Sequence, residues 1–546
     1  MAFECQKDTQ DNLGDTSTNH LDSSQVGKAV PEQLGLTGNR KLEPLGSENL
    51  QGAFGKLGIH SADPFFKSPR SFVDLPPALV SEILNFLDPK ELGTISCVNT
   101  SLYKLASEHH VWKEFYSERW GHPVNSIGLA QDDKSWKELF VERDFRSKTF
   151  MGRYSIDTLY GHTEAVRTVF VLVSKKLVFT SGYDQVVRMW DMEEGRSIAS
   201  SRPLGCTIRA VAADSRLLVA GGTDGFIHGW HAHDENPNLF DISSPPHDQN
   251  TEFRLWEHVG PITCLALDFN RIYSGSWDMT VRLWDRASLK CLKVLMHNDW
   301  VWSLVPHETT IGSTAGSSVH IWETNTGNQL VVINGAHGGN VYSLARSHTG
   351  KLLFSGGEDG SIHMFEITGN SECKNARKIA TWIPHTGPVH SLAFEFPWLV
   401  SASSDGRISL IDVRGLLKTK KRFSTENADS RGDYLCQKNV EPPQRMLHGF
   451  GCNLFSVGIG FDRIVCGGEE GVVRIWNFSQ ALDIEQRVRA LRGKRIENRM
   501  RRRRIQQETN VKGNLDGQCS FAAKKNLING NKNEWHSKRR VSGKGR

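Results

Sequence analysis

The sequence lacks any apolar run long enough to cross a membrane. Its longest apolar stretches, such as VRTVFVLV at residues 166–173, have the length of a single strand. A membrane-spanning helix needs roughly 20 predominantly apolar residues. We therefore expect no transmembrane segment and no membrane partner.

Cysteine is scarce and scattered. None of the ten cysteines forms a close pair with the spacing of a zinc site. The first residues also lack the charged and apolar regions of a secretory signal. We expect a protein of an intracellular, reducing compartment, with no metal site and no cofactor.

Glycine and tryptophan are plentiful instead, with 50 and 15 copies, and many of them fall in one short pattern. At residues 274–285 the chain reads SGSWDMTVRLWD, in which Asp278 stands six positions before Trp284. An acid six positions before an apolar or aromatic residue returns at 180–191, 220–231, 355–366, 401–412 and 466–477. A further copy at 312–323 keeps Trp322 but has Gly316 in place of the acid.

Repetition decides whether this pattern serves catalysis or architecture. Ser274, Asp278 and the upstream His258 are the residue types of an acyl-transfer triad. An enzyme needs one such site, whereas a pattern in seven diverged copies is a building unit. We therefore interpret the pattern as architecture and expect no catalytic residue in it.

The unit resembles the WD repeat, whose copies of about 40–45 residues each form one four-stranded propeller blade. Two of the intervals between copies are long, and their excess lies in the polar segments 234–250 and 418–444, which we interpret as surface insertions. The resemblance implies an all-β, seven-bladed propeller over residues 151–480. The segment Tyr154–Leu159 is expected to complete the last blade and so to remove the open sheet edges.

The WD-repeat resemblance also implies a hydrogen-bonded chain of His, Ser or Thr, Asp and Trp within a blade. Complete sets would be His162, Thr180, Asp184 and Trp190 in one repeat, and His258, Ser274, Asp278 and Trp284 in another. Further repeats open with His297, His337, His385 and His448. The second repeat lacks the His, the fourth lacks the acid, and the fifth and sixth lack the Trp, so we expect packing to hold those blades.

Residues 71–121, ahead of the repeats, carry apolar residues at helical spacing. Pro76 and Pro77 suit a first helical turn, and the DPKE run at residues 88–91 starts a second helix. The segment resembles an F-box in Leu75-Pro76, Ile83-Leu84, Leu87, the LDPKEL run, Val98 and Trp112, although Leu102 or Tyr103 replaces the usual Trp. The alternative is a plain helical hairpin packed on the propeller.

The F-box resemblance implies docking to a Skp-type adaptor that bridges to a cullin. The expected adaptor-binding residues are Leu75, Pro76, Leu79, Ile83, Leu84, Leu87, Leu92, Val98 and Trp112. An F-box, a helical linker at residues 122–150 and a WD-repeat propeller resemble the layout of substrate receptors in SCF-type ubiquitin ligases. We therefore expect a non-catalytic receptor whose propeller captures an unidentified protein substrate for ubiquitination.

One face of the propeller is expected to bind this substrate, through residues at the start of each inner strand and before each turn acid. The candidates are Trp300, Trp302, Tyr183, Trp277, Tyr342, Phe455, Arg167 and Arg209. Aromatic residues outnumber arginines in this set, so we favour a degron with an apolar or aromatic anchor over a phosphorylated one, which needs several converging Arg side chains. Packing of Trp300 or Trp302 between blades is the alternative.

The two ends of the chain differ from the middle. Residues 1–70 are rich in polar residues and Gly and are expected to be disordered. From Glu485 onward there are 19 Lys and Arg against 5 acids, so we expect residues 481–546 to form a basic, largely disordered tail. The polar ends are compatible with a plant member of the family.

The basic runs at 492–507 and 537–540 resemble nuclear-import signals, which places the protein in the nucleus, with the cytoplasm as a second compartment. Such runs also bind nucleic-acid phosphates, or form a solvated tail. A nuclear WD-repeat scaffold that contacts nucleic acid and acts outside a ligase is therefore the alternative function.

Overall fold

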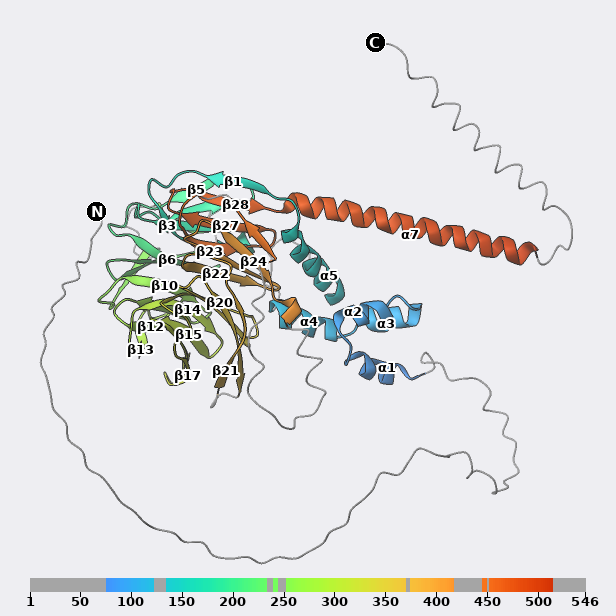
Figure 1. Cartoon of the computed structure of the whole chain (residues 1–546), viewed down its shortest axis with the longest axis horizontal. Coiled ribbons are helices and arrows are strands. Elements are labelled where there is room, and N and C mark those ends of the chain that lie inside the picture. Colours follow the sequence, from blue (N-terminus) through green and yellow to red (C-terminus); the bar gives the residue numbers. More distant parts are fainter. Residues whose placement is uncertain are drawn as a thin grey trace, which may run out of the picture. The chain divides into compact units, whose positions relative to one another are not determined.

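The computed structural model describes residues 75–121, 134–232, 239–243, 252–369, 374–416, 444–448 and 451–513. Within these ranges seven four-stranded antiparallel sheets form a β-propeller (Figure 1), which confirms the expected fold class. Six of the sheets are built from four strands that follow one another in the chain. Residues 1–70, for which we predict disorder, lie outside the described ranges.

The first six blades follow one another in chain order. The first three are β2 (Val166–Leu172), β3 (Leu177–Gly182), β4 (Arg188–Asp191), β5 (Ser197–Ser200); β6 (Ile208–Ala213), β7 (Leu217–Gly222), β8 (Phe226–His231), β9 (Glu252–Trp256); β10 (Ile262–Leu267), β11 (Arg271–Ser276), β12 (Thr280–Asp285), β13 (Cys291–Met296). The next three are β14 (Val301–His307), β15 (Thr310–Ala315), β16 (Ser318–Glu323), β17 (Gln329–Ile333); β18 (Val341–Arg346), β19 (Leu352–Gly357), β20 (Ile362–Gly369), β21 (Lys374–Trp382); β22 (Val389–Glu395), β23 (Trp398–Ser403), β24 (Ile408–Asp412), β25 (Arg445–Leu447).

The seventh blade closes the ring. It consists of β26 (Leu454–Ile459), β27 (Arg463–Gly468), β28 (Val473–Asn477) and, as its outer strand, β1 (Ser155–Leu159) from the other end of the propeller. β1 pairs antiparallel with β28, from Ser155 opposite Asn477 to Leu159 opposite Val473. The prediction that this segment completes the last blade is thus confirmed. Because β1 directly precedes the first blade in the chain, this pairing joins the two ends of the propeller and covers the edge of β28.

One of the two long insertions is not purely a surface feature. Phe240 and Ile242, in the first insertion, are buried in the core between the first two blades. Phe240 packs against Phe179 of β3, with ring centroids 5.8 Å apart. The polar composition of the segment concealed two apolar anchors. Most of the second insertion lies outside the described residues.

Short helices precede the propeller. They are α1 (Pro77–Leu84), α2 (Pro89–Ile95), α3 (Thr100–Ser107), α4 (Val111–Trp120), α5 (Trp136–Ser147) and the 3₁₀ turn η2 (Lys148–Met151), and a second 3₁₀ turn, η3 (Val173–Lys175), follows β2. The DPKE run starts α2 as expected, because the Asp88 carboxylate accepts the backbone N–H of Glu91 while Glu91 accepts that of Asp88. No helix within the described ranges is long and apolar enough to cross a membrane.

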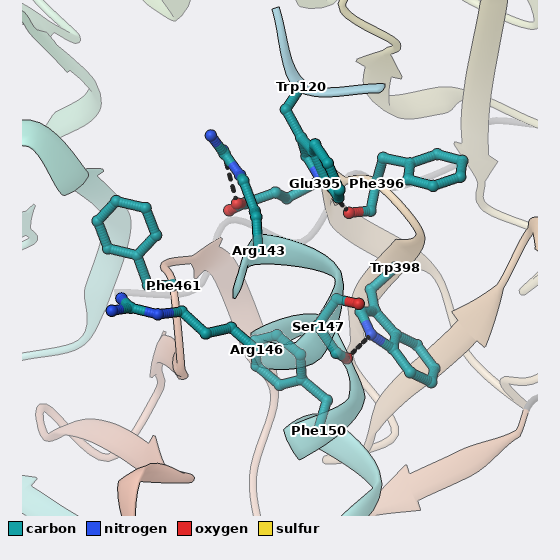
Figure 2. Close-up of a pocket in the computed structure, with 9 residues that line it drawn as sticks. All are labelled: Trp120, Arg143, Arg146, Ser147, Phe150, Glu395, Phe396, Trp398 and Phe461. Carbon is teal, nitrogen blue, oxygen red and sulfur yellow. Dashed lines mark hydrogen bonds and ion pairs between the residues drawn. The ribbon is translucent and has the colours of Figure 1, made fainter. Parts of the chain in front are cut away.

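Helix α5 belongs to the core of the helical module as well as to the linker. Phe140 of α5 is buried and packs against Trp112 and Trp120 of α4, with ring centroids 5.2 and 5.3 Å apart. The same two helices also hold the propeller. Trp120 Nε1 donates to the carbonyl of Phe396, and Trp398 Nε1 donates to the carbonyl of Ser147 (Figure 2).

An ion pair crosses the same junction. Arg143 Nη2 of α5 lies 3.0 Å from Glu395 Oε1 at the end of β22 (Figure 2). Burial raises the pKa of Glu395, and Arg143 offsets part of this rise. Together with the tryptophan hydrogen bonds, the pair fixes α4 and α5 to the sixth blade at several points.

The C-terminal region differs from the predicted disordered tail. Ser479–Gly513 forms one continuous helix, α7, directly after β28 (Figure 1). Ala481 in its first turn is buried. The helix formers Arg, Gln, Glu and Leu dominate the segment, and their local propensity outweighs the basic composition that suggested disorder. Residues 514–546 lie outside the described ranges.

Candidate functional sites

The repeated pattern forms hydrogen-bonded chains inside the blades. In the third blade Trp284 Nε1 donates to Ser274 Oγ at 2.9 Å, Ser274 Oγ lies 2.7 Å from His258 Nε2, and His258 Nδ1 lies 2.7 Å from Asp278. The first blade repeats the arrangement with its own four residues. Both predicted sets are confirmed. Burial alone would raise the pKa of Asp278, but hydrogen bonds from His258 and Thr280 hold it well below its usual range.

Some blades depart from this chain. In the fourth blade, which lacks the acid, His297 Nδ1 lies 3.2 Å from the carbonyl of Leu295 instead. In the fifth blade, His337 contacts Asp359 through Nδ1 at 3.0 Å and Ser355 through Nε2 at 2.7 Å, so neither nitrogen is left for a metal. His448 is exposed and takes no part in such a chain, which corrects its assignment as the opening His of the last repeat.

The second blade contains a cluster that resembles a metal site. Cys206, Asp224 and His228 offer a thiol, a carboxylate and an imidazole within 4.8 Å of one another. However, Arg254 Nε donates to His228 Nδ1 at 3.2 Å, which leaves the imidazole proton on Nε2, the nitrogen nearer Asp224. A protonated nitrogen cannot ligate a metal, so the residues present do not fit an ion.

The helical module exposes an apolar surface on α1 to α3. Of the predicted adaptor-binding residues, Leu75, Pro76, Leu79, Ile83 and Val98 are exposed. Two large neighbours that the prediction omitted are also exposed: Phe86, of which 89% is accessible, and Tyr103. We call Leu75, Leu79, Ile83, Phe86, Val98 and Tyr103 the apolar docking surface. Phe86 could have been found from the sequence, because it continues the helical spacing from Leu79 and Ile83.

Three of the predicted adaptor-binding residues point the other way. Leu84, Leu92 and Trp112 are buried in the core of the helical module, and Leu87 is partly buried against it. Trp112 Nε1 donates to the carbonyl of Ala106. Leu84, Leu92 and Trp112 hold the helices together and offer no surface to an adaptor, which corrects their assignment. Helical spacing identifies apolar positions but not which of two adjacent ones, such as 83 and 84, faces inward.

A ring of side chains surrounds the central axis of the propeller. In each blade the first strand has a β-bulge directly after its first residue, as the pairing shift between Val166 and Thr168 shows. A bulge re-aims the residue that it inserts. The central ring consists of the bulged residue from each blade: Arg167, Arg209, Thr263, Trp302, Tyr342, His390 and Phe455.

Ring contacts connect most members of the central ring. Trp302 lies 4.9 Å from Tyr342, Tyr342 lies 5.4 Å from His390, and His390 lies 5.7 Å from Phe455, measured between ring centroids. The Arg167 guanidinium then stacks over Phe455 at 4.3 Å. All of these side chains are partly buried, so each keeps some accessible surface.

Trp277 and Trp300 extend the aromatic part of the ring outward. Trp277 stacks on Trp300 at 5.2 Å, contacts Trp302 at 5.6 Å and lies under the Arg209 guanidinium at 4.5 Å. Trp300 is exposed, and so is Tyr183 on the turn after β3. The structure therefore brings all eight predicted substrate-binding residues to one region of the propeller and places Thr263 and His390 beside them.

The ring is rich in donors and positive charge. Burial and the neighbouring Arg167 lower the pKa of Arg209 to about 10. Burial and the two arginines together lower the pKa of His390 to about 4, so His390 is neutral at pH 7. Neither arginine forms an ion pair with a residue that the structure describes, and Arg167 Nε, Trp277 Nε1 and Trp302 Nε1 are buried without hydrogen-bond partners. A partner with an aromatic or apolar group and an acceptor would satisfy this surface.

Comparison with protein families agrees with this architecture. The "F-box-like" family model matches residues 72–118, and the model "WD domain, G-beta repeat" matches residues 153–191, 250–285, 327–366 and 376–412. The crystal structure of the WD40 β-propeller domain of Doa1 covers 60% of this chain and 97% of its own, with a TM-score of 0.46 and 20% identity.

Similar proteins differ in how much of this chain they match. Mitochondrial division protein 1 of Aspergillus oryzae is 23% identical over 44% of this chain and 36% of its own length, and autophagy-related protein 16 of Arabidopsis thaliana is 20% identical over 52% and 53%. An F-box/WD-40 repeat-containing protein of Arabidopsis thaliana is 65% identical over 479 residues, which are 87% of each chain. Because this match includes both the helical module and the propeller, the chain belongs to the family of F-box/WD-40 repeat proteins.

Proposed function

We propose that this protein is the non-catalytic substrate-recognition subunit of an SCF-type ubiquitin ligase. The observation that carries the proposal is the apolar docking surface on an F-box-like module whose opposite side is already packed. An apolar patch of this kind on a small helical module marks an interaction site, and a Skp-type adaptor bridging to a cullin is its partner in this proposal.

The junction between the modules supports this role. A receptor accelerates ubiquitin transfer by holding its substrate at a high effective concentration near the transfer enzyme. That requires a defined geometry between the adaptor-binding and substrate-binding modules. The ion pair of Arg143 with Glu395 and the hydrogen bonds of Trp120 and Trp398 supply several fixed points between them.

Adaptor docking is tested by replacing one exposed isoleucine. Ile83→Ser removes an anchor of about 1.5–3 kcal/mol, which predicts a roughly 10- to 100-fold loss of affinity for a purified Skp-type adaptor. Ile383→Ser is the control, because Ile383 is also an exposed isoleucine but lies on the propeller. The affinity of the adaptor for the full-length wild type and for each full-length variant is measured by calorimetric titration. If both variants bound the adaptor as tightly as the wild type, the assignment of the docking surface would be contradicted.

Co-purification separates the ligase from the alternative scaffold. A ligase receptor brings down both the adaptor and a cullin from cell extract, and Ile83→Ser loses both. Proximity labelling then compares the wild type with Ile83→Ser, with and without proteasome inhibition. Candidate substrates are the labelled proteins that proteasome inhibition stabilises in the wild type but not in Ile83→Ser. If neither adaptor nor cullin accompanies the intact chain, the scaffold outside a ligase replaces this proposal.

Substrate capture is assigned to the central ring and the adjoining Trp277 and Trp300. Its aromatic side accommodates an apolar or aromatic anchor, and the unpaired Arg167 and Arg209 accommodate an acidic or phosphorylated group beside it. Trp302→Ala should prolong the lifetime of the identified substrate in cells without weakening adaptor binding, and Arg167→Ala should do less. A silent Trp302→Ala combined with a strong Arg167→Ala effect would make phosphate recognition the main interaction.

Nuclear localisation is part of the proposal and rests on the basic run at residues 492–507. The second run, at 537–540, lies outside the described residues. A fluorescent fusion should lose nuclear accumulation when the basic residues of both runs are replaced by Gln. Unchanged nuclear fluorescence would contradict import through these runs.

A further inference from the structure

The charge on helix α7 takes no part in adaptor docking or substrate capture, and its arrangement goes beyond what a nuclear-import signal needs. Between Arg487 and Gln507 the helix has ten basic residues and a single acid, Glu497. All but one of the side chains in this segment are exposed, the exception being the partly buried Val488. The basic residues are mostly arginine, whose planar guanidinium binds phosphate oxygens through paired hydrogen bonds.

Part of this charge forms a stripe along one side of the helix. At about 100° per residue, Arg492, Arg495, Arg499, Arg502 and Arg503 fall within an arc of roughly 100°. We call these five residues the arginine stripe. It extends about 16 Å along the axis. Glu497 lies outside the arc, so the stripe contains no acid.

The stripe has no counter-charge within the described part of the chain. No ion pair joins its members to another described residue. Neighbours in the stripe are three or four residues apart, a spacing at which like charges destabilise a helix. Arg489 precedes the stripe in α7 and contacts another helix, since its guanidinium lies 5.3 Å from the centroid of the Phe145 ring of α5. The stripe itself is free to contact an external polyanion.

The composition of α7 discriminates between polyanions. Single-stranded nucleic acids are held by aromatic platforms on which bases stack, and residues 487–507 contain no aromatic side chain. A membrane-surface helix needs one continuous apolar face, whereas Ile496 and Met500 share one side of the helix and Ile505 lies roughly 140–180° away from them. A straight, rigid row of guanidinium groups instead matches the regular row of phosphates along a duplex.

We propose that α7 binds the phosphate backbone of double-stranded DNA through the arginine stripe, without preference for sequence. The major groove of B-DNA is wide enough to admit a helix beside the phosphates, whereas that of duplex RNA is deep and narrow. This activity is independent of the proposed ligase function, because it requires neither the docking surface nor the central ring.

Two triple variants of the full-length protein test the proposal. One replaces Arg495, Arg499 and Arg502 of the stripe by Gln, and the control replaces Lys494, Arg501 and Arg504, which lie roughly 140° away around the helix. Both remove three positive charges, and Gln keeps the helix propensity of Arg. Far-UV circular dichroism checks that the helix remains, and fluorescence anisotropy measures binding to a 30-base-pair DNA of arbitrary sequence at several salt concentrations.

Five phosphate contacts predict that log K falls with log salt at a slope of about −4.5, and the stripe variant should flatten this slope by about 2.7. The control variant should change it by less than about 1. Equal losses in both variants would overturn the stripe, because they would show that total charge alone matters. The absence of binding, or tighter binding to duplex RNA, single-stranded RNA or anionic phosphatidylserine vesicles than to duplex DNA, would overturn the choice of partner.

Discussion

Replacement of Asp278 by Ala removes the terminal acceptor of the hydrogen-bonded chain in the third blade. Its Oδ2 atom accepts from His258 Nδ1 at 2.7 Å, and its Oδ1 atom accepts from Thr280 Oγ1 at 2.6 Å and from Thr280 N at 3.0 Å. His258 and Thr280 are buried, so water cannot replace the lost acceptor without a rearrangement.

The cost follows from the two buried side-chain donors. Each unsatisfied buried donor costs about 1–3 kcal/mol. The fourth blade shows how far the protein can compensate, because its acid-free His297 uses the carbonyl of Leu295 at the longer distance of 3.2 Å. We therefore expect Asp278→Ala to lower the free energy of unfolding by about 2–4 kcal/mol, or the melting temperature by about 4–8 °C.

A double-mutant cycle isolates the interaction. Urea unfolding followed by tryptophan fluorescence is measured for Asp278→Ala, for His258→Ala and for the double variant. If the two residues act as one chain, Asp278→Ala costs at least about 1 kcal/mol less when His258 is already absent. Additive effects, or an unchanged melting temperature in Asp278→Ala, would refute the architectural role of the repeated pattern.

Three further predictions concern other parts of the fold. Leu84→Ala should cost about 2–5 kcal/mol in the helical module and abolish adaptor binding by unfolding it, which circular dichroism distinguishes from the folded Ile83→Ser variant. Arg143→Ala should accelerate amide hydrogen exchange in α5 by leaving Glu395 unpaired, whereas Arg146→Ala, whose Glu142 partner is exposed, should not. Burial lowers the pKa values of four histidines to about 4 or 3, so only the unfolded chain gains protons at these groups between pH 6.5 and 5.5. Urea titrations should therefore show stability falling by about 1 kcal/mol per group over this range, and a flat profile would contradict this. These groups are His228, His297, His363 and His390.

The sequence by itself determined the propeller and its closure. Repeats of similar length with a strand-turn-strand pattern can bury their apolar residues only against copies of themselves, so the number of copies sets the number of blades. The spacing of His258, Ser274, Asp278 and Trp284 also revealed their chain, because strand geometry fixes which residues of neighbouring strands meet. The strand at 155–159 could be assigned because the last repeat lacked a partner for its outer edge.

Only the tertiary structure decided which apolar and basic residues are available to partners. Ile83 and Leu84 are adjacent in sequence, yet the packing of α3 and α4 against α1 buries the second and leaves the first exposed. The β-bulge of each inner strand turns one side chain toward the axis, which placed His390 and Thr263 beside the predicted candidates. The pattern of alternation gives no sign of such a bulge, because the extra residue depends on pairing with the next strand. The arginine stripe likewise required α7 to be helical, since the positions of its residues around the axis exist only once the helix has formed.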